Sequence, residues 1–174
     1  MTDIPRDSLF GKLNPVGYKA LEGATTFCKL RGNPYVEISH WVHQIVLNQD
    51  SDVHHIIRAF ELDSARIAAD LQISLDGLPR GASSISDFSV HLVNAVERAW
   101  SWASLKYGHA QVRTGHIVVA MLKSEGLKGG LLSLSSEFGK IKPDQLADEF
   151  EAIVQGSPES ALVASDGSGL SGGE

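Results

Sequence analysis

The chain has 174 residues, enough for one globular domain with a full core or for two small domains that share an interface. Lys and Arg number 15 against 21 Asp and Glu, so the formal net charge is −6. This balance excludes broad electrostatic binding to nucleic acid or to an anionic membrane, since both need a basic surface. A hydrophobic content of 43% excludes a wholly disordered chain, and the apolar runs are far shorter than the roughly 18 residues of a membrane span. Cys28 is the only cysteine, so no internal disulfide can form and a reducing cytoplasm is expected.

The first long helix is predicted between two local signals. Asn14 before Pro15 is typical of a helix N-cap followed by proline at the first helical position. Gly32, Asn33 and Pro34 predict the end of this helix. The apolar positions between these signals recur at helical spacing: Val16, Ala20, Ala24, Phe27 and Cys28.

Three more helices are predicted in the first half of the chain. Asp63 is expected to cap the last of them. Gly77, Pro79 and Gly81 then predict a connection over 76–84. The apolar residues that mark these helices are Trp41, Val42, Ile45 and Val46, then Val53, Ile56, Ile57 and Phe60, then Ile67 and Leu71.

The second half restarts at Ser86 with another set of predicted helices. Thr114 is expected to cap one helix, a short helix is expected over 131–138, and Pro143 opens the last one. The buried face of the long helix that begins this half is formed by Phe88, Leu92, Val96, Ala99, Ala103 and Tyr107. No run alternates convincingly between apolar and polar residues, so strands are not expected.

An internal repeat appears when the two halves are aligned. His40 matches His116 at 76 positions. The other matched pairs are Leu21 with Val96, Ala24 with Ala99, Val36 with Val112, Phe60 with Phe138, Ile67 with Leu146, and Leu71 with Phe150. We therefore predict an all-α fold of two tandem four-helix repeats, about 14–78 and 86–154, packed as a pseudo-dimer around one core. Chance similarity between amphipathic helices is the alternative.

The last residues differ in composition from the rest of the chain. The segment 156–174 is rich in Gly and Ser, and Glu159, Asp166 and Glu174 are its only charges. Such a segment cannot bury enough apolar surface to offset its ordering entropy. We therefore predict one domain over 1–155, followed by a flexible linker towards a further domain.

Seven histidines raise the question of a metal site. His40 and His43 stand at positions i and i+3, and His54 and His55 are adjacent. A catalytic zinc needs three protein ligands, and the HExxH motif is absent, so a metal-dependent enzyme is a distant alternative. The match between His40 and His116 favours a structural role instead, in which each ring lies near a helix start and forms a hydrogen bond within its own half.

Recognisable catalytic motifs are missing from the sequence. It contains neither GxxxxGK[ST] nor GxSxG. Cys28 lies on the apolar face of a predicted helix, which favours a small buried residue over a nucleophile. The acidic residues are scattered over predicted solvated faces. The sequence therefore predicts a binding module with no catalytic residues, no metal and no cofactor of its own.

Apolar surface is the remaining candidate for function. Leu9, Phe10 and Leu13 can share one face of a short helix that has no counterpart in the second half. Docked beside the starts of the two long helices, this short helix would form one wall of a groove. Phe88 and Leu92, expected in the first turns of the second long helix, would add to it. An apolar groove between helices is the usual receptor for an amphipathic helix, so we predict that these five residues bind a partner. The alternative is that they belong to the ordinary core.

The doubled four-helix motif, with an apolar second helix after His40 and His116, resembles the Clp N-terminal domain over roughly 9–153. Three stretches are also similar to the start of the ClpV ATPases, the AAA+ family of bacterial type VI secretion. These stretches run from Leu9 to Pro15, from Phe27 to Glu37 and from His91 to Trp100.

The resemblance implies a cytoplasmic, hexameric ATPase whose other modules use ATP and Mg²⁺. The N-terminal domain would bind an N-terminal helix of the large subunit of the contractile sheath, so that the hexamer can disassemble contracted sheath. In this family an extra N-terminal helix helps form the groove, and residues 9–13 occupy that place. The isolated domain is expected to be a monomer with no nucleic-acid or membrane partner. The alternatives are the N-domain of a general Clp disaggregase, which binds unfolded chains or adaptors, and a structural module for ring assembly.

Overall fold

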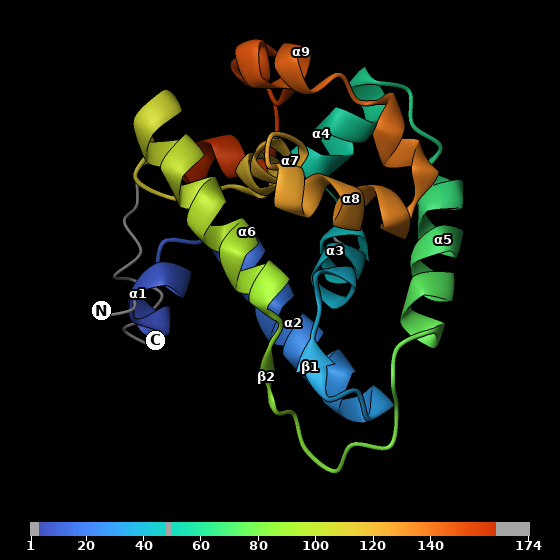
Figure 1. Ribbon diagram of the computed structural model, residues 1–174. Helices are drawn as coiled ribbons and strands as arrows, with labels where there is room; N and C mark the ends of the chain where they lie inside the picture. The colour runs from blue at the N-terminus through green and yellow to red at the C-terminus, as the bar shows by residue number, and fades with distance from the viewer. Residues whose placement is uncertain (1–3, 48–49, 163–174) are drawn as a thin grey trace.

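The computed structural model describes residues 4–47 and 50–162, and its architecture is all-α as predicted. Figure 1 shows the helices gathered around one another, with two short strands side by side at the lower edge. The first half contains α1 (Arg6–Phe10), α2 (Pro15–Arg31), β1 (Tyr35–Val36), α3 (Ile38–Leu47), α4 (Asp52–Ala59) and α5 (Ser64–Asp76). The second half contains β2 (Asp87–Phe88), α6 (Val90–Ser101), a π-helical turn (Trp102–Lys106), α7 (Thr114–Leu122), α8 (Glu125–Leu134), a 3-10 turn (Ser136–Lys140), α9 (Pro143–Asp148), α10 (Phe150–Ile153) and a final 3-10 turn (Pro158–Leu162).

Local signals fix several helix ends where the sequence predicts them. Asn14 Oδ1 accepts a hydrogen bond from the amide of Gly17 at 3.0 Å, which caps the start of α2. Asp63 Oδ1 accepts one from the amide of Arg66 at 3.1 Å and caps α5 in the same way. α2 ends at Gly32, whose φ of 71° lies in the left-handed region that favours glycine. These three predictions are confirmed.

Two equivalent strand contacts join the halves. Val36 pairs in parallel with Phe88, and Leu13 forms a parallel bridge with Val112. The amide of Ser89, after Phe88, donates to the carbonyl of Val36 at 2.9 Å, and the amide of Asn14, after Leu13, donates to the carbonyl of Val112 at 2.9 Å. Leu13 and Phe88 are 75 positions apart, and the two valines are 76 apart, so one contact is the repeat image of the other. One hydrophobic cluster spans both halves, as the predicted pseudo-dimer requires.

The strand contacts correct two expectations. The sequence predicts no strands, yet two-residue strands lie at 35–36 and 87–88. Phe88 therefore precedes α6 instead of lying in its first turn. The N-cap of α6 is Ser89, whose Oγ accepts a hydrogen bond from the amide of Leu92 at 3.1 Å. A strand of two residues shows no periodicity, because its hydrogen bonds are set by the opposite half of the molecule.

His40 and His116 lie buried at equivalent helix starts, which confirms their predicted structural role. His40 Nδ1 accepts a hydrogen bond from the amide of Glu37 at 2.8 Å, and His116 Nδ1 accepts one from the amide of Arg113 at 2.9 Å. Desolvation lowers the pKa of His40 to about 4 and the pKa of His116 to about 2. Both rings therefore stay neutral near pH 7 and keep the lone pair that these bonds need.

The prediction of a flexible linker from residue 156 is wrong for 156–162. Pro158–Leu162 forms a 3-10 turn, and Glu159 within it is 0% exposed. The Gly and Ser content of this segment gives no indication that one acidic residue, Glu159, is buried and anchors it. The folded domain therefore extends past residue 155, and the rest of the predicted linker, 163–174, lies outside the described residues.

The carboxylate of Glu159 binds residues from both halves. Its Oε1 accepts hydrogen bonds from Asn14 Nδ2 and from the amide of Thr114, both at 2.8 Å. Its Oε2 accepts one from the amide of Asp52 at 2.7 Å and one from the hydroxyl of Thr114. Burial and the nearby Asp52 carboxylate raise the pKa of Glu159. The end of the described chain is thus fixed at the junction of the two halves.

Candidate partner-docking face

The short helix α1 is held by its packing against α6. With five residues it is too short to be stable in water by itself. Leu9 and Phe10 are 3% and 9% exposed, and Figure 1 shows α1 at the left of the molecule beside the lower part of α6. The bridge from Leu13 to Val112 then fixes the chain where α1 leads into α2. The N-terminal segment therefore docks beside the start of the second long helix, as predicted.

Phe10 and Phe88 meet at the seam between α1 and α6. Their ring centroids are 5.0 Å apart and the rings are inclined at 79°, an edge-to-face arrangement. Such pairs contribute about 0.5–1.5 kcal/mol beyond the area that they bury. Phe88 is carried by β2 and stays half-buried, so part of its ring faces solvent. Of the five residues predicted to bind a partner, Phe88 offers the most surface.

The other predicted contact residues belong largely to the core. Leu9 is 3% exposed, and Leu13 and Leu92 are both 0% exposed. Side chains this deeply buried cannot touch a partner while the domain keeps its fold, so the expectation that these three bind a partner is corrected. Leu92 faces inward from α6, and the strand-like bridge covers Leu13. These three residues form the part of the core on which the contact between α1 and α6 rests.

Charged and aromatic groups border the seam. Arg6 forms an ion pair with Asp87, and its hydrogen bond holds the pKa of Asp87 below the usual range. Lys12 Nζ lies 4.7 Å from the ring centroid of Trp100 on α6, a cation–π contact. Sequence reasoning missed Trp100. Trp100 lies seven residues after Val93, which is also half-buried, so both residues share one face of α6. This spacing is the signal in the sequence that could have identified Trp100.

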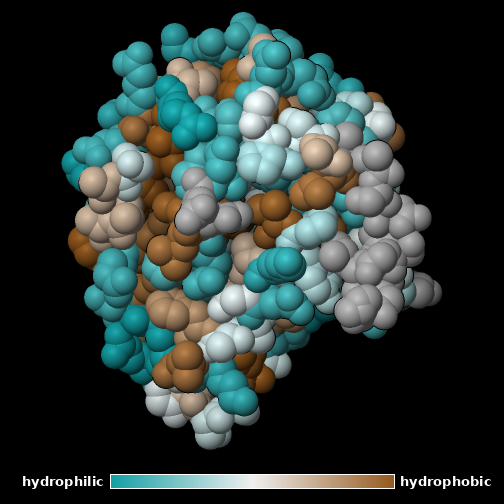
Figure 2. Space-filling model, turned by 180° about the vertical axis from the view of Figure 1, so that it is seen from behind, coloured by the Kyte–Doolittle hydropathy of each residue, from teal (hydrophilic) through white to brown (hydrophobic). Residues whose placement is uncertain are grey.

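A hollow lined by both apolar and polar residues lies between α2 and α3, with a volume of about 490 Å³. Leu47 at its rim is 65% exposed. The residues that line this hollow are Pro15, Val16, Lys19, Ala20, Gln44 and Leu47. Figure 2, which views the molecule from behind, shows apolar residues in separate patches with polar residues between them. Exposed apolar surface alone therefore does not single out the seam, and Leu47 offers a comparison site for tests of binding.

The remaining histidines of interest have structural partners. His43 stacks on Phe27 with ring centroids 5.0 Å apart. His54 Nδ1 lies 2.8 Å from Ser51 Oγ, and its Nε2 lies 3.1 Å from the carbonyl of Val46. Among residues 4–47 and 50–162, no group of three or more His, Cys, Asp and Glu side chains is arranged to hold a metal ion. Over the same residues, every helix is too short or too polar to cross a membrane.

The amino-acid sequence is similar to those of known proteins. Residues 13–135 match the Clp repeat (R) N-terminal domain. The chain is 53% identical over 167 residues to the AAA+ ATPase ClpV1 of Pseudomonas aeruginosa. That alignment covers 96% of this chain but 18% of the relative, so the chain spans less than a fifth of the longer protein.

Solved structures share the fold. The N-domain of ClpV from Vibrio cholerae matches with a TM-score of 0.80 at 28% identity, over 91% of this chain and 96% of that one. A complex of a ClpV N-domain with a VipB peptide matches with a TM-score of 0.77 at 28% identity, over 91% of this chain and 99% of that one. The domain in that complex holds a peptide.

Proposed function

Because the chain belongs to the family of Clp repeat N-terminal domains, we propose that it is the substrate-recognition domain of an AAA+ ATPase of type VI secretion. The similarity to ClpV1 over nearly the whole chain supports this assignment. The hexameric ATPase would act in the bacterial cytoplasm, with ATP and Mg²⁺ bound by modules outside this chain. The domain itself would bind substrate and carry out no reaction.

The partner in this proposal is an N-terminal helix of the large subunit of the contractile sheath. The complex of a ClpV N-domain with a VipB peptide supports a peptide partner for this fold. On this chain the helix would lie along the seam between α1 and α6, with apolar side chains against Phe88 and Trp100. The observation that carries the proposal is the position of Phe88, a large aromatic residue that is held by β2 and Phe10 yet still half-exposed.

Ordinary binding energetics fit this role. Burying one large apolar side chain contributes about 1.5–3 kcal/mol before the costs of association. A short helix with a few such anchors would reach micromolar affinity, about −8 kcal/mol. Six domains on one ring would raise the avidity for assembled sheath over free subunits. Weak single contacts would then allow release once a subunit has been extracted.

The test is a titration of the domain with a labelled peptide from the N-terminus of the large sheath subunit. Phe88→Asp should weaken binding at least about tenfold, because it places a charge where the apolar contact forms. Leu47→Asp is the matched control, since it introduces the same charge at an exposed leucine in the α2–α3 hollow. Circular dichroism checks that both variants keep the fold. Deleting residues 9–13 is unsuitable, because it removes buried core residues.

Two outcomes would contradict this proposal. Unchanged peptide binding by a folded Phe88→Asp domain would remove the seam as the site. Equal affinity for an unfolded model protein and for the sheath peptide would favour a general disaggregase.

A further inference from the structure

Glu159 fills a site where three helix starts meet. Its carboxylate accepts hydrogen bonds from the first amides of α4 and α7 and from Asn14, the N-cap of α2. A helix start attracts an anion, because its first amides have no acceptors within the helix. This junction is therefore a carboxylate site that the chain occupies with its own residue.

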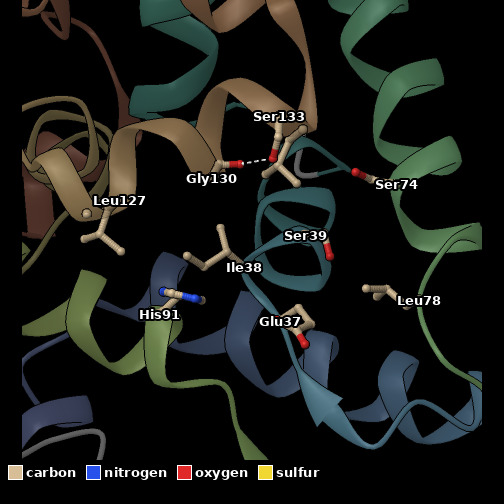
Figure 3. Close-up of a pocket in the computed structure, with 11 residues that line it drawn as sticks. Glu37, Ile38, Ser39, Ser74, Leu78, His91, Leu127, Gly130 and Ser133 are labelled. Carbon is tan, nitrogen blue, oxygen red and sulfur yellow. Dashed lines mark hydrogen bonds between the residues drawn. The ribbon is translucent and has the colours of Figure 1, made fainter.

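The internal repeat produces a second junction of the same kind. In the order of the helices, α6, α3 and α8 are the repeat equivalents of α2, α7 and α4. Their first turns border a cavity of about 350 Å³ between the halves. The residues from these first turns that line the cavity are Ile38, Ser39, His91, Gly126 and Leu127, and Figure 3 shows most of them around the open space.

The second junction has hydrogen-bond donors without acceptors. Ser39 is 5% exposed and its Oγ has no hydrogen-bond partner. In Figure 3 its hydroxyl points to the space beside Leu78. The amides of Ile38 and Ser39 also lack an acceptor among the residues that the structure describes. A buried unpaired hydroxyl costs about 1–3 kcal/mol.

The two equivalent amides in the first junction are both bound. Thr114, which lies 76 positions after Ile38, donates its amide to Glu159 at 2.8 Å. Gly115, which lies 76 positions after Ser39, donates its amide to Asp52 Oδ2 at 3.2 Å. The two junctions thus have equivalent helix starts, but only in the first do carboxylates accept these two amides.

We propose that the cavity between the starts of α3, α6 and α8 binds an acidic side chain of a partner polypeptide, as the first junction binds Glu159. The occupant is a polypeptide and not a small carboxylate, because Ile38, Leu78 and Leu127 give the cavity an apolar wall for neighbouring residues. This site goes beyond the proposed sheath contact, since neither Phe10 nor Phe88 lines it.

One charge in the cavity opposes the ligand. Glu37 lines the cavity and stands 76 positions before Arg113, so an acid takes the place that the second half gives to a base. Its carboxylate repels an anion and keeps the site weak. Glu37→Gln should therefore tighten binding.

Helix α8 offers a variant that blocks the cavity and a matched control. Gly130 lines the cavity and Gly129 does not. A Cβ atom at either position would meet no other atom within 4 Å, so a side chain can leave the backbone at both positions without a clash at Cβ. Gly130→Leu fills the cavity, and Gly129→Leu makes the same change beside it.

The probe is a heptapeptide with the sequence of residues 156–162, Gly-Ser-Pro-Glu-Ser-Ala-Leu, added to the domain with its own Glu159 in place. Amide chemical shifts of Ile38 and Ser39 should move in a saturable way. A peptide with Gln in place of Glu should bind at least about tenfold more weakly, because it loses the charge-assisted hydrogen bonds. Gly130→Leu and Ser39→Ala should remove the shifts, Gly129→Leu should keep them, and Glu37→Gln should reach saturation at lower peptide concentration.

Three results would overturn the proposal. Shifts confined to Thr114 and Gly115 would show exchange with Glu159 at the first junction. Unchanged binding by Gly130→Leu, or no shift at millimolar peptide, would remove the cavity as a site. Equal shifts with acetate would assign the site to small carboxylates. Phe88 does not line this cavity, so the Phe88→Asp domain can lose the sheath peptide and still bind the acidic peptide. Failure of either proposal therefore leaves the other standing.

Discussion

Arg113 and Asp52 form a buried ion pair that joins the two halves. Arg113 Nε donates to Asp52 Oδ2 at 2.8 Å, and Nη2 donates to Oδ1 at 2.7 Å. The two side chains are 2% and 0% exposed. Asp52 begins α4 in the first half, and Arg113 precedes α7 in the second. Two parallel hydrogen bonds fix both orientation and distance, so this pair sets how the halves face each other.

Breaking this pair should be costly. Asp52→Asn leaves the Arg113 guanidinium buried without a countercharge, and loss of one partner from such a pair typically costs about 3–5 kcal/mol. Urea unfolding monitored by circular dichroism measures the change. Asp76→Asn is the control, since Asp76 pairs with Arg31 at 2.8 Å but is 53% exposed and should change stability little. Equal effects of the two variants would show that burial of the pair does not matter.

Two glycines should respond in opposite ways to alanine. A Cβ at Gly115 would lie 2.8 Å from Phe150 Cε1 and 3.0 Å from Asp52 Cβ, so Gly115→Ala must displace packed groups and should cost about 1–3 kcal/mol. A Cβ at Gly23 would meet Gln44 Oε1, the end of a flexible side chain. Gly23→Ala should therefore gain about 0.5–1 kcal/mol from helix propensity. Thermal unfolding of both variants compares them, and a destabilised Gly23→Ala would mean that Gln44 cannot move.

The buried His40 should make the domain sensitive to acid. Its folded pKa of about 4 lies below its ordinary value of 6.5, so between these values the unfolded chain binds a proton that the folded domain does not. The free energy of unfolding should therefore fall as pH drops through this range, by about 1.4 kcal/mol per pH unit for one proton. His40→Asn keeps an acceptor near Nδ1 and should remove that part of the slope. Urea unfolding at several pH values measures the slopes, and identical slopes for the two proteins would show that His40 does not cause the acid sensitivity.

Cys28 should react with thiol reagents only when the domain opens. It is 0% exposed, and its Sγ lies 3.3 Å from the carbonyl of Asn33 and 3.2 Å from that of Tyr35. Burial raises the pKa of the Cys28 thiol, which lowers the fraction of reactive thiolate. A chromogenic disulfide should therefore label Cys28 slowly in buffer and quickly in urea. Fast labelling of the folded domain would show that α2 opens locally.

The sequence was sufficient where the deciding residues are close together. Asn14 with Gly17, Asp63 with Arg66, and the glycine at 32 are local signals, and each lies where it was predicted. The repeat was readable because matched core positions keep a nearly constant spacing. The structural role of His40 and His116, each bonded near a helix start within its own half, followed from that match.

The sequence was insufficient where a contact joins distant residues. Ser86 and Ser89 are equally good helix caps, and only the pairing of β2 with β1 selects Ser89. Leu13 looks available for a partner in the sequence, but its bridge to Val112 encloses it. Glu159 lies in a Gly- and Ser-rich segment, and its bond to Asn14 spans 145 residues, so nothing near it in the sequence predicts its burial.

The anchoring of Glu159 also determines how mechanical load enters the domain. A pull on the chain beyond Leu162 reaches the fold at the 3-10 turn and passes first to the hydrogen bonds of Glu159. Those bonds hold the first turns of α4 and α7, one from each half. The force is therefore shared between the two halves and does not unfold a single helix from its end. A force applied at the C-terminal end of the described residues would therefore load both halves of the domain at once.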